Sequence, residues 1–372
     1  MTKRVVVCLS GGVDSTVAAA LLKEQGYDVA GITFWLWSFP GAPDYAGQTK
    51  CCSLDTAALA AQEVGIPHEK IDASEAFHCL VLQDFIARYR NGETPNPCGR
   101  CNRHLRFGLA LDYATRNGYD FVATGHHVRC LREPDDTLSL RRGVDPGKDQ
   151  TYFLYGLAQD DLDRLLFPIG ELSKEEVYAF ARERDLTCAE LSESQDLCFA
   201  VAGRTSFLFA QTDLQPGPIL DPEGNWLGTH EGLPNYTIGQ RRGLGVASGH
   251  PLFVIGIDPE RNALMVGEED RLFGSELCAV DANYLAGHPP VDRSHLDVKI
   301  RYRSPAVGAT FHRGSGGRFG LTFDEPQRAI TPGQLAVLYE GDRLLGGGTI
   351  AKPDADPGLP GSPGIIGRRR GG

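Results

Sequence analysis

A glycine-rich turn near the start of the chain has the residue types that bind phosphate. The stretch "VVVCLSGGVDSTVAAALL" at residues 5–22 places Ser10, Gly11 and Gly12 between a β-rich run and a helical run. Glycines let the backbone approach an anion closely, and a helix start points free N–H groups and its positive dipole end toward that anion. The pattern indicates a pyrophosphate cradle. It differs from a Walker A loop and from G-x-G-x-x-G, and the alternative is an ordinary N-capped helix after a glycine turn.

The acidic residue of this turn, Asp14, adds information about the ligand. A carboxylate beside bound phosphates is useful mainly if it holds Mg²⁺ or orients the leaving group. We therefore expect Asp14 to take part in catalysis on a Mg²⁺-bound nucleotide.

A second group of reactive residues is the stretch "TPNPCGRCN" at residues 94–102. Two prolines stiffen a predicted loop that delivers Cys98 and Cys101 just before a helix. The helix dipole and nearby arginines would lower a thiol pKa there, so Cys101 has the surroundings of a reactive thiolate. The alternative is a structural zinc half-site of Cys98, Cys101 and His104, although a tetrahedral site needs a fourth ligand and the chain has no second C-x-x-C.

A further cysteine, Cys198, lies in "ESQDLCFA" at residues 193–200. A lone cysteine before phenylalanine is usually part of a hydrophobic core. The residues by themselves give Cys198 no other role.

The composition limits the classes of protein. The chain has 372 residues, 41% of them hydrophobic, and carries a formal net charge of −11, so we expect several domains and no nonspecific nucleic-acid coat. Local basic stretches at residues 98–106 and 299–318 leave room for a nucleic-acid surface. Ten cysteines are too few for a disulfide scaffold. Neither a signal peptide nor a membrane-spanning run is seen, which predicts a cytoplasmic protein.

The elements that must position these residues alternate between strand and helix through the first part of the chain. This alternation predicts an α/β doubly wound domain with a parallel sheet. A strand is expected over residues 119–128, then a hairpin over 130–143, and a long helix over 160–186 with Ser173 and Glu176 spaced as a capping box.

From about Pro216 the sequence pattern changes to short β-prone runs, and residues 252–267 are predicted to form a hairpin. We predict a catalytic domain at residues 1–205, a small central β-rich domain at 206–275 and a C-terminal β-barrel at 276–352. Residues 353–372 are rich in proline and glycine and are expected to be disordered.

The turn at residues 10–15 resembles the S-G-G-x-D-S signature of the PP-loop ATP pyrophosphatases. This resemblance implies cleavage of ATP between the α and β phosphates, with adenylation of an acceptor oxygen and release of pyrophosphate. The superfamily includes NAD and GMP synthetases, argininosuccinate synthetase and several tRNA-modifying enzymes, and the turn alone does not choose among them.

Seven further motifs resemble those of the bacterial tRNA-specific 2-thiouridylases and occur in the same order, from residue 5 to about residue 352. They are "TPNP…CN", "ATGHHVR", "KDQTYFLY", "FPIGEL", "DLCF", "GQRRGLG" and "TPGQLAVLY". The resemblance implies a tRNA-uridine 2-sulfurtransferase that thiolates the wobble uridine of tRNA for Lys, Glu and Gln. In that reaction ATP activates the C2 oxygen, sulfur replaces it, and AMP leaves.

The resemblance also implies roles for individual residues. Cys198 would carry a persulfide and Cys101 would be the nucleophile that completes transfer, with a disulfide between them after turnover. The implied ATP contacts are Cys8, Leu9, Ser10, Gly11, Gly12, Val13, Asp14, Ser15, Phe34 and Gly125. The implied target-base contacts are Asn96, Pro97 and Cys98. The implied tRNA contacts are His126, Lys148, Asp149, Gln150, Arg301, Tyr302 and Gln334.

Arg301 and Tyr302 pair a phosphate binder with a ring that can stack on a base. If they lie in a strand, alternation would put them on opposite faces of the sheet. We expect the target base to be flipped out of its stack.

One residue departs from the pattern of some family members, which carry an aspartate where this chain has Cys98. Together Cys98, Cys101 and Cys198 could hold a 4Fe–4S cluster with an open iron site for sulfide. The persulfide route remains the leading mechanism. Two other classes stay open at this stage: an amide-forming ATP pyrophosphatase synthetase, and a non-catalytic RNA-binding protein. The expected partners are the tRNA anticodon stem-loop and a sulfur-donor protein, either a cysteine desulfurase or a relay protein, with no membrane.

Overall fold

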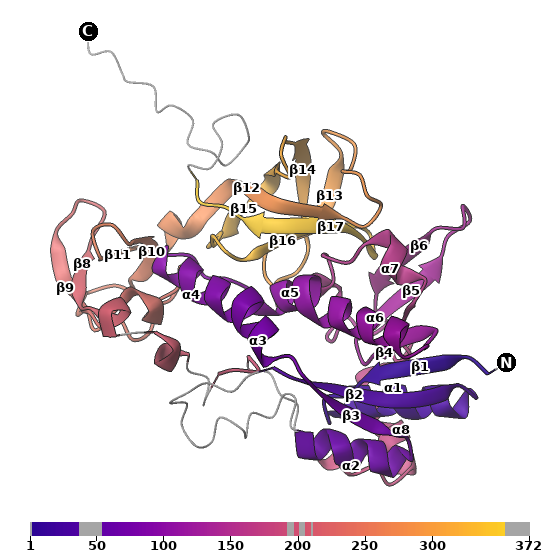
Figure 1. Cartoon of the computed structure of the whole chain (residues 1–372). Coiled ribbons are helices and arrows are strands. Elements are labelled where there is room, and N and C mark those ends of the chain that lie inside the picture. The colour runs from indigo at the N-terminus through magenta and orange to yellow at the C-terminus, as the bar shows by residue number, and fades with distance from the viewer. Residues whose placement is uncertain (1, 37–53, 192–196, 201–204, 210, 354–372) are drawn as a thin grey trace. The chain divides into compact units, whose positions relative to one another are not determined.

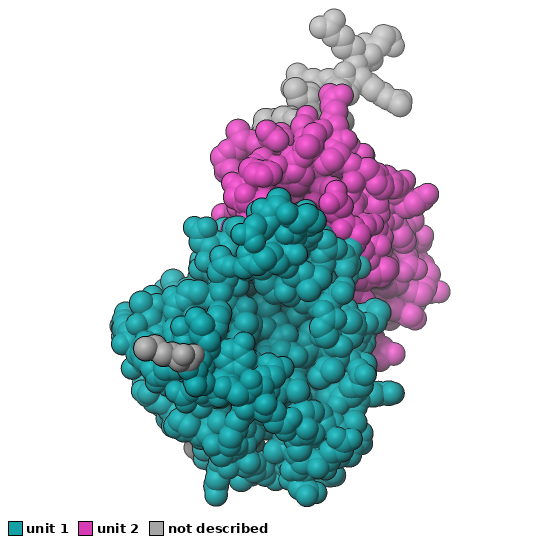
Figure 2. All heavy atoms as spheres, turned by 90° about the vertical axis from the view of Figure 1, so that its right-hand side faces the viewer, with its two compact units in different colours: residues 1–84, 97–207, 342–344 teal, residues 85–96, 208–341, 345–372 magenta. Residues whose placement is uncertain are grey.

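The computed structural model describes residues 2–36, 54–191, 197–200, 205–209 and 211–353. The chain divides into two compact units, coloured separately in Figure 2. Unit 1 comprises residues 1–84, 97–207 and 342–344, and unit 2 comprises residues 85–96, 208–341 and 345–372. Cys51, Cys52 and residues 354–372 lie outside the described residues, as do positions 193–196 of the Cys198 motif.

Unit 1 is built on a five-stranded sheet whose strand order is β3-β2-β1-β4-β7. All four pairings are parallel. The strands are β1 (Arg4–Cys8), β2 (Asp28–Trp35), β3 (His68–Asp72), β4 (Phe121–Thr124) and β7 (Leu165–Leu166). Because the chain leaves β1 first toward β2 and later toward β4, the order reverses between β1 and β4. This confirms the doubly wound parallel sheet, and the reversal is where such sheets bind ligands.

Helices cover both faces of this sheet (Figure 1). The first face packs on α1 (Val13–Glu24), α2 (Leu54–Val64) and α8 (Lys174–Glu183), through one apolar cluster that includes Val5 and Val7. The intervening Val6 is also fully buried, on the opposite face, where α6 (Phe107–Arg116) lies against β1 and β4. A strand buried on both sides explains why β1 is a continuous valine run.

Two helical runs, one before Cys98 and Cys101 and one that contains them, each include a π-type turn. The first run is α3 (Ser74–Phe77), a π segment (His78–Leu82) and α4 (Gln83–Arg90). The second is α5 (Pro97–Cys101), a π segment (Asn102–Arg106) and α6. The expectation of a loop up to Cys101 is therefore wrong, since helix begins at Pro97. Proline suits the first helical position because its missing N–H has no partner to lose there.

Two further expectations need correction in unit 1. The strand predicted over residues 119–128 is interrupted at 125–127, and β5 (Val128–Arg132) begins a new pairing with β6 (Leu138–Arg142), which confirms the hairpin. The long helix predicted over residues 160–186 is replaced by α7 (Gln159–Leu162), β7 and α8, because Leu165 and Leu166 pair with β4 and proline and glycine follow. The capping box of Ser173 and Glu176 is confirmed.

Unit 2 contains two β-structures, which confirms the prediction of a small β-rich part and a barrel. The first is a sheet in the order β10-β11-β8-β9, formed by β8 (Gly217–Leu220), β9 (Trp226–His230), β10 (Phe253–Asp258) and β11 (Ala263–Gly267). The predicted hairpin is β10 with β11.

Short 3-10 turns connect elements along the described chain, at Thr151–Phe153, Thr187–Glu190, Ser206–Leu208, Gln211–Leu214, Leu233–Asn235 and Glu269–Leu272.

The second β-structure is a closed barrel in the order β12-β15-β14-β13-β16-β17, in which β12 also pairs with β17. Its strands are β12 (Phe273–Tyr284), β13 (His295–Lys299), β14 (Val307–Arg313), β15 (Phe319–Arg328), β16 (Leu335–Glu340) and β17 (Arg343–Ile350). Phe311 and Phe319 are fully buried at its centre, with ring centroids 5.6 Å apart. The predicted boundaries at 205/206 and 275/276 remain predictions.

None of the helices in the described part of the chain is both long and apolar enough to cross a bilayer.

The barrel core yields a prediction about stability. Replacing the fully buried ring of Phe311 with alanine should lower the free energy of unfolding by about 3–5 kcal/mol, because it removes apolar contacts and leaves a cavity. The matched control is Phe273→Ala in β12, whose ring is 50% exposed and whose loss should cost under about 1 kcal/mol. Thermal unfolding followed by circular dichroism checks both, and equal losses would contradict this packing.

Candidate functional site

The glycine-rich turn connects the end of β1 to the first turn of α1 at the sheet's point of reversal. Its internal bonds are short-range: Ser10 N–H donates to Ser15 Oγ at 3.1 Å, and Ser15 Oγ donates to the Gly12 carbonyl at 3.1 Å. The N-cap is Gly12, and no side chain caps the helix there. Helix α1 therefore begins without a side-chain cap within the described residues, which suits the predicted phosphate cradle. The ordinary N-capped helix does not describe this turn.

Two glycines allow the close approach of backbone on which the cradle depends. Gly11 has φ +79°, and a side chain there would collide with Thr56 of α2. Gly125 follows β4, and a Cβ at this position would lie 2.5 Å from the Asp14 carbonyl carbon and the Ser15 nitrogen. The structure therefore places Gly125, a predicted ATP contact, directly against the cradle. Only a glycine permits this approach between β4 and α1.

Asp14 is held by two basic side chains that come from distant parts of unit 1. Its Oδ1 accepts from Lys174 Nζ at 2.6 Å and contacts His127 Nε2 at 3.2 Å. Burial alone would raise the pKa of Asp14, but hydrogen bonds from His127 and Lys174 and the charge of the lysine hold that pKa below its ordinary value of 3.8. Asp14 is therefore a carboxylate at neutral pH. Both contacts use Oδ1.

Lys174 was not singled out in the sequence, although its surroundings are unusual for a lysine. It is the first residue of α8, where the helix dipole disfavours a positive charge, and its side chain is only 10% exposed. Its backbone N–H donates to Asp145 Oδ2 at 3.1 Å. A charge kept in such a position needs a compensating partner, and here that partner is Asp14. The only signal in the sequence was a lysine inside the capping box.

His127 was also missed, and it faces the same carboxylate. It is 2% exposed, and among the described residues its Nδ1 has no hydrogen-bond partner. Its backbone N–H donates to Gln150 Oε1 at 2.9 Å. Gln150, predicted to contact tRNA, thus orders the residue beside Asp14.

The neighbouring His126 lies in the apolar interior rather than at a surface. Its Nδ1 is 2.8 Å from Thr124 Oγ1, and its ring packs between Phe107 and Phe167. Burial and the positive charge of Arg106 lower the pKa of His126 to about 3, so the ring is neutral at physiological pH. These contacts match those of a satisfied core histidine, and the tRNA contact predicted for His126 remains a prediction.

Two predicted ATP contacts are largely enclosed. Phe34 is 6% exposed within β2. Burial raises the pKa of the Cys8 thiol to about 11, against the opposing charge of Arg106. Cys8 is therefore a protonated thiol and not a nucleophile, and its place at the end of β1 lets it line the cradle through its backbone. The charge of Arg106 acts on Cys8 and on His126, which puts this arginine near the same edge of the sheet.

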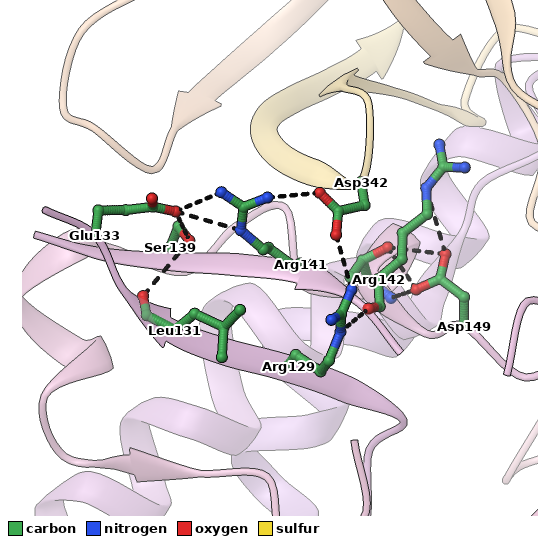
Figure 3. A network of polar contacts seen from close by, with 9 residues as sticks. Arg129, Leu131, Glu133, Ser139, Arg141, Arg142, Asp149 and Asp342 are labelled. Atoms are coloured by element: carbon green, nitrogen blue, oxygen red, sulfur yellow. Dashed lines mark hydrogen bonds and ion pairs between the residues drawn. The ribbon is translucent and has the colours of Figure 1, made fainter. Parts of the chain in front are cut away.

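The hairpin of β5 and β6 forms an ion-pair network with the short segment 342–344 of unit 1 (Figure 3). Asp342 accepts from Arg129 and from Arg141 at 2.7 Å each, and Arg141 also pairs with Glu133 at 2.7 Å. Arg129 donates further to the Arg142 carbonyl at 2.7 Å. These guanidinium groups are committed to holding the hairpin that begins one residue after His127.

Asp149 lies at the edge of this network (Figure 3). It is buried, accepts from Thr151 N–H at 3.0 Å and from Thr151 Oγ1 at 2.7 Å, and lies 4.0 Å from Arg142 Nε. Its contacts begin the 3-10 turn at Thr151–Phe153. Of the predicted tRNA contacts at 148–150, Lys148 is partly exposed, while Asp149 and Gln150 support local structure.

The three candidate cysteines occupy different environments in unit 1. Cys98 is exposed in the first turn of α5, Cys101 is 6% exposed one turn later, and Cys198 is partly exposed in a short turn. The part of the chain that the structure describes gathers no group of three or more His, Cys, Asp or Glu side chains able to hold a metal. The arrangement therefore supports neither the zinc half-site nor the three-cysteine cluster.

The helical run at residues 74–90 contacts the residues next to Cys101 and next to Cys198. Phe199, next to Cys198, packs on Phe77 of α3 with ring centroids 5.9 Å apart. Arg100, next to Cys101, donates to the Leu80 carbonyl at 2.6 Å and pairs with Asp84 at 3.3 Å. The two anchoring positions, 77 and 80, are three residues apart. The structure thus attaches both cysteine segments to neighbouring turns of one helix.

The remaining predicted contacts belong to unit 2. Arg301 and Tyr302 lie in a turn, since β13 ends at Lys299, so the expected strand alternation does not apply to them. Arg301 donates to the Ala329 carbonyl at 2.7 Å, and Lys299 Nζ lies 5.7 Å from the Tyr302 ring. Asn96 and Gln334 are both bonded within unit 2.

Comparison with known proteins gives matches along nearly the whole chain. Residues 3–202 match a family model described as the tRNA methyl transferase HUP domain, residues 205–268 its PRC-barrel domain, and residues 274–350 an aminomethyltransferase beta-barrel domain. The chain is 46% identical over 352 residues to "tRNA-specific 2-thiouridylase MnmA" of Moorella thermoacetica, covering 93% of this chain and 98% of the relative. It is 44% identical to the protein of the same name from Chloroflexus aggregans, covering 94% and 99%.

Solved structures are more distant. A 4-thiouridine synthetase in complex with RNA and ATP has a TM-score of 0.35 at 16% identity, covering 50% of this chain and 42% of that one. An NMN synthetase from Francisella tularensis has a TM-score of 0.31 at 18% identity, covering 52% and 66%. At these TM-scores neither structure supports an argument about this chain.

The ion pair at Asp14 yields a prediction with a definite pH dependence. Lys174→Met should lower the free energy of unfolding at pH 8 by about 1.5–3 kcal/mol, because the carboxylate loses a charged hydrogen-bond donor. Without the lysine, burial should push the folded-state pKa of Asp14 upward. When the folded-state pKa of a carboxyl group is raised, the protein gains stability as the pH falls through that pKa. The difference in free energy of unfolding between Lys174→Met and the wild type should therefore narrow between pH 8 and pH 5.

Lys174→Arg serves as the matched variant because it keeps the charge. Its free energy of unfolding should differ less from that of the wild type, and the difference should be independent of pH. Chemical denaturation of all three proteins at several pH values measures the gaps. A Lys174→Met gap that stays constant or widens on acidification would show that burial does not dominate at Asp14.

Proposed function

The chain belongs to the family of tRNA-specific 2-thiouridylases, and on this premise we propose that it replaces the C2 oxygen of the wobble uridine of tRNA for Lys, Glu and Gln with sulfur, using ATP. The observation that carries the proposal is an uncapped glycine-rich turn, predicted to bind phosphate, in the same unit as two cysteine segments anchored on one helix. The first feature suits activation of an oxygen, and the second suits delivery of sulfur.

Activation is needed because the C2 carbonyl of uridine is a poor electrophile. In the proposed first step the C2 oxygen attacks the α-phosphorus of ATP, the bond to the β-phosphate breaks, and pyrophosphate leaves. The backbone N–H groups of residues 11–15 would bind the phosphates. Lys174 and Arg106 would supply positive charge at the same edge of the sheet.

Magnesium fits this arrangement through Asp14. This residue is ionised, and its contacts within the described residues use only Oδ1, so Oδ2 remains to ligate a cation. A bound Mg²⁺ would neutralise charge on the departing pyrophosphate. Asp14 and His127 would keep Lys174 oriented toward the cradle.

The proposed second step delivers sulfur from a persulfide on Cys198. Its terminal sulfur attacks C2, and AMP leaves with the former C2 oxygen. The Cys101 thiolate then attacks Cys198 Sγ, which breaks the sulfur–sulfur bond, frees the thiocarbonyl and leaves a disulfide between the two cysteines. A reductant must restore both thiols before the next turnover. The common attachment of the two segments to residues 77–84 supports this pairing.

The partners follow from this chemistry. The anticodon stem-loop supplies the target uridine, and a cysteine desulfurase or a relay protein supplies the persulfide sulfur. The cytoplasm, where tRNA and thiol reductants occur together, is the compartment that suits the reaction.

Our first functional prediction concerns the cysteine pair. Cys101→Ser and Cys198→Ser should each reduce 2-thiouridine formation by more than about a thousandfold, because each removes a group that forms or breaks a sulfur bond. Affinity for tRNA should stay within about threefold, since phosphate contacts dominate it. Liquid chromatography of digested tRNA and filter binding provide the two measurements.

Cys130→Ser is the matched control for these variants. Burial, with the charge of Asp163, raises the pKa of the Cys130 thiol to about 11, so this cysteine should be dispensable. Loss of tRNA binding in the Cys101 or Cys198 variants comparable to the loss of activity would assign these cysteines a structural role instead.

A second functional prediction separates the persulfide route from the cluster route of Cys98, Cys101 and Cys198. Anaerobically purified protein should be fully active without iron, and Cys98→Ala should keep more than about a tenth of wild-type activity. Iron and acid-labile sulfide analysis measures the cluster. Iron that is required for activity and lost together with activity in Cys98→Ala would overturn the persulfide route.

One incubation distinguishes thiolation from the other two classes. Protein, tRNA, ATP, Mg²⁺ and a persulfide donor should give AMP, pyrophosphate and 2-thiouridine in equal amounts. Pyrophosphate release that depends on ammonia without tRNA would indicate an amide-forming synthetase. Binding of tRNA without ATP cleavage would indicate a non-catalytic RNA-binding protein.

A further inference from the structure

A turn of the barrel, residues 331–334, binds the segment that leads into α5 (Pro97–Cys101), which we call the cysteine helix. We call these residues the clamp turn, and residues 94–96 the approach segment; both belong to unit 2. Thr94 N–H donates to the Pro332 carbonyl at 2.8 Å, and Gln334 Nε2 donates to the Thr94 carbonyl at 2.7 Å. Asn96 N–H donates to the Gly333 carbonyl at 3.3 Å. Both backbone groups of Thr94 are therefore bound to the clamp turn.

The clamp turn is itself bonded to the last strand of the barrel. Gly333 N–H donates to the Ile350 carbonyl at 2.8 Å, and Ile350 N–H donates to the Gln334 carbonyl at 2.7 Å. Gly333 has φ +91°, and a Cβ there would lie 2.9 Å from the Thr94 carbonyl carbon. The turn is thus held on one side by β17, and on the other side it touches the approach segment as closely as a glycine allows.

Arg301 supports the same turn from the other end. Its NH2 group donates to the Ala329 carbonyl at 2.7 Å and to Thr331 Oγ1 at 3.0 Å, while Thr331 Oγ1 donates to the Ala329 carbonyl at 2.8 Å. Thr331 is 2% exposed. A continuous set of hydrogen bonds therefore runs within unit 2 from Arg301 to the backbone of Thr94.

The approach segment leads directly into the cysteine helix along the chain. Asn96 is followed directly by Pro97, the first residue of α5, and Cys98 and Cys101 lie within that helix. Proline restricts its own φ and the conformation of the residue before it, so little freedom separates the clamped backbone from the start of α5.

We propose that Gln334 is a positioning residue: through the Thr94 carbonyl it holds the approach segment so that Asn96, a predicted target-base contact, is set for the sulfur step. This inference rests on the proposed function for its reaction, but its structural part stands separately. Gln334 should affect the sulfur step, and should leave ATP cleavage and tRNA affinity unchanged. It is an alternative to the direct tRNA contact predicted for Gln334, which stays a prediction, and it is based on the bond from Gln334 Nε2 to the Thr94 carbonyl.

Hydrogen exchange tests the structural part. Gln334→Glu keeps the side-chain size but replaces the donor with a carboxylate that faces a carbonyl, so exchange at Thr94 and Asn96 should accelerate about tenfold. Gln334→Lys keeps an N–H donor and should restore slow exchange. The melting temperature of the barrel should be the same in both variants. Unchanged exchange in Gln334→Glu would overturn the clamp.

Single-turnover kinetics at saturating tRNA test the catalytic part. Gln334→Glu should slow 2-thiouridine formation about tenfold, with pyrophosphate release and the tRNA Kd within about twofold of wild type, and Gln334→Lys should recover the rate. A tRNA Kd that weakens as much as the rate would make Gln334 a binding residue and overturn the proposal. A wild-type protein that forms no 2-thiouridine would refute the proposed function, while hydrogen exchange would still decide whether the clamp exists.

Discussion

A single carboxylate oxygen, Oδ1 of Asp14, joins three parts of unit 1 that lie far apart in the sequence. Lys174 at the start of α8 and His127 after β4 both reach it, and Asp14 itself belongs to the first turn of α1. A buried lysine at a helix N-terminus is unfavourable unless such a partner compensates it. The arrangement therefore holds Lys174, paired with Asp14, at the edge of the sheet where the phosphates of ATP would bind in the proposed activation step.

The anchoring of the cysteines shows how the fold can serve a second step. The helix run at 74–90 accepts Arg100 and Phe199 at neighbouring turns, so it bears on both cysteine segments of unit 1. The last part of this run and the approach segment are counted with unit 2, where Thr94 is bonded to the clamp turn. The cysteine helix thus begins at the point where the chain passes from one unit to the other.

Much of the fold was predictable because periodicity and turn chemistry are local. The β1 valine run, the glycine turn, the capping box at Ser173 and the hairpin of β10 and β11 all follow from short-range patterns. What the sequence did not reveal depends on long-range partners. Lys174 and His127 gain their meaning only from Asp14, β7 exists because it pairs with β4, and Gln334 is defined by its bond to Thr94. His126 is a further example. The motif in which it lies does not indicate that the rings of Phe107 and Phe167 enclose its side chain.

The central claim is that the cradle turns the uridine C2 oxygen into a leaving group before sulfur enters. The most direct measurement uses tRNA whose target uridine carries ¹⁸O at C2, followed through one turnover with ATP and a persulfide donor, with mass spectrometry of the nucleotide product. The account predicts one ¹⁸O atom in each AMP released, in step with 2-thiouridine formation. AMP without the label, formed at the same rate as 2-thiouridine, would contradict it.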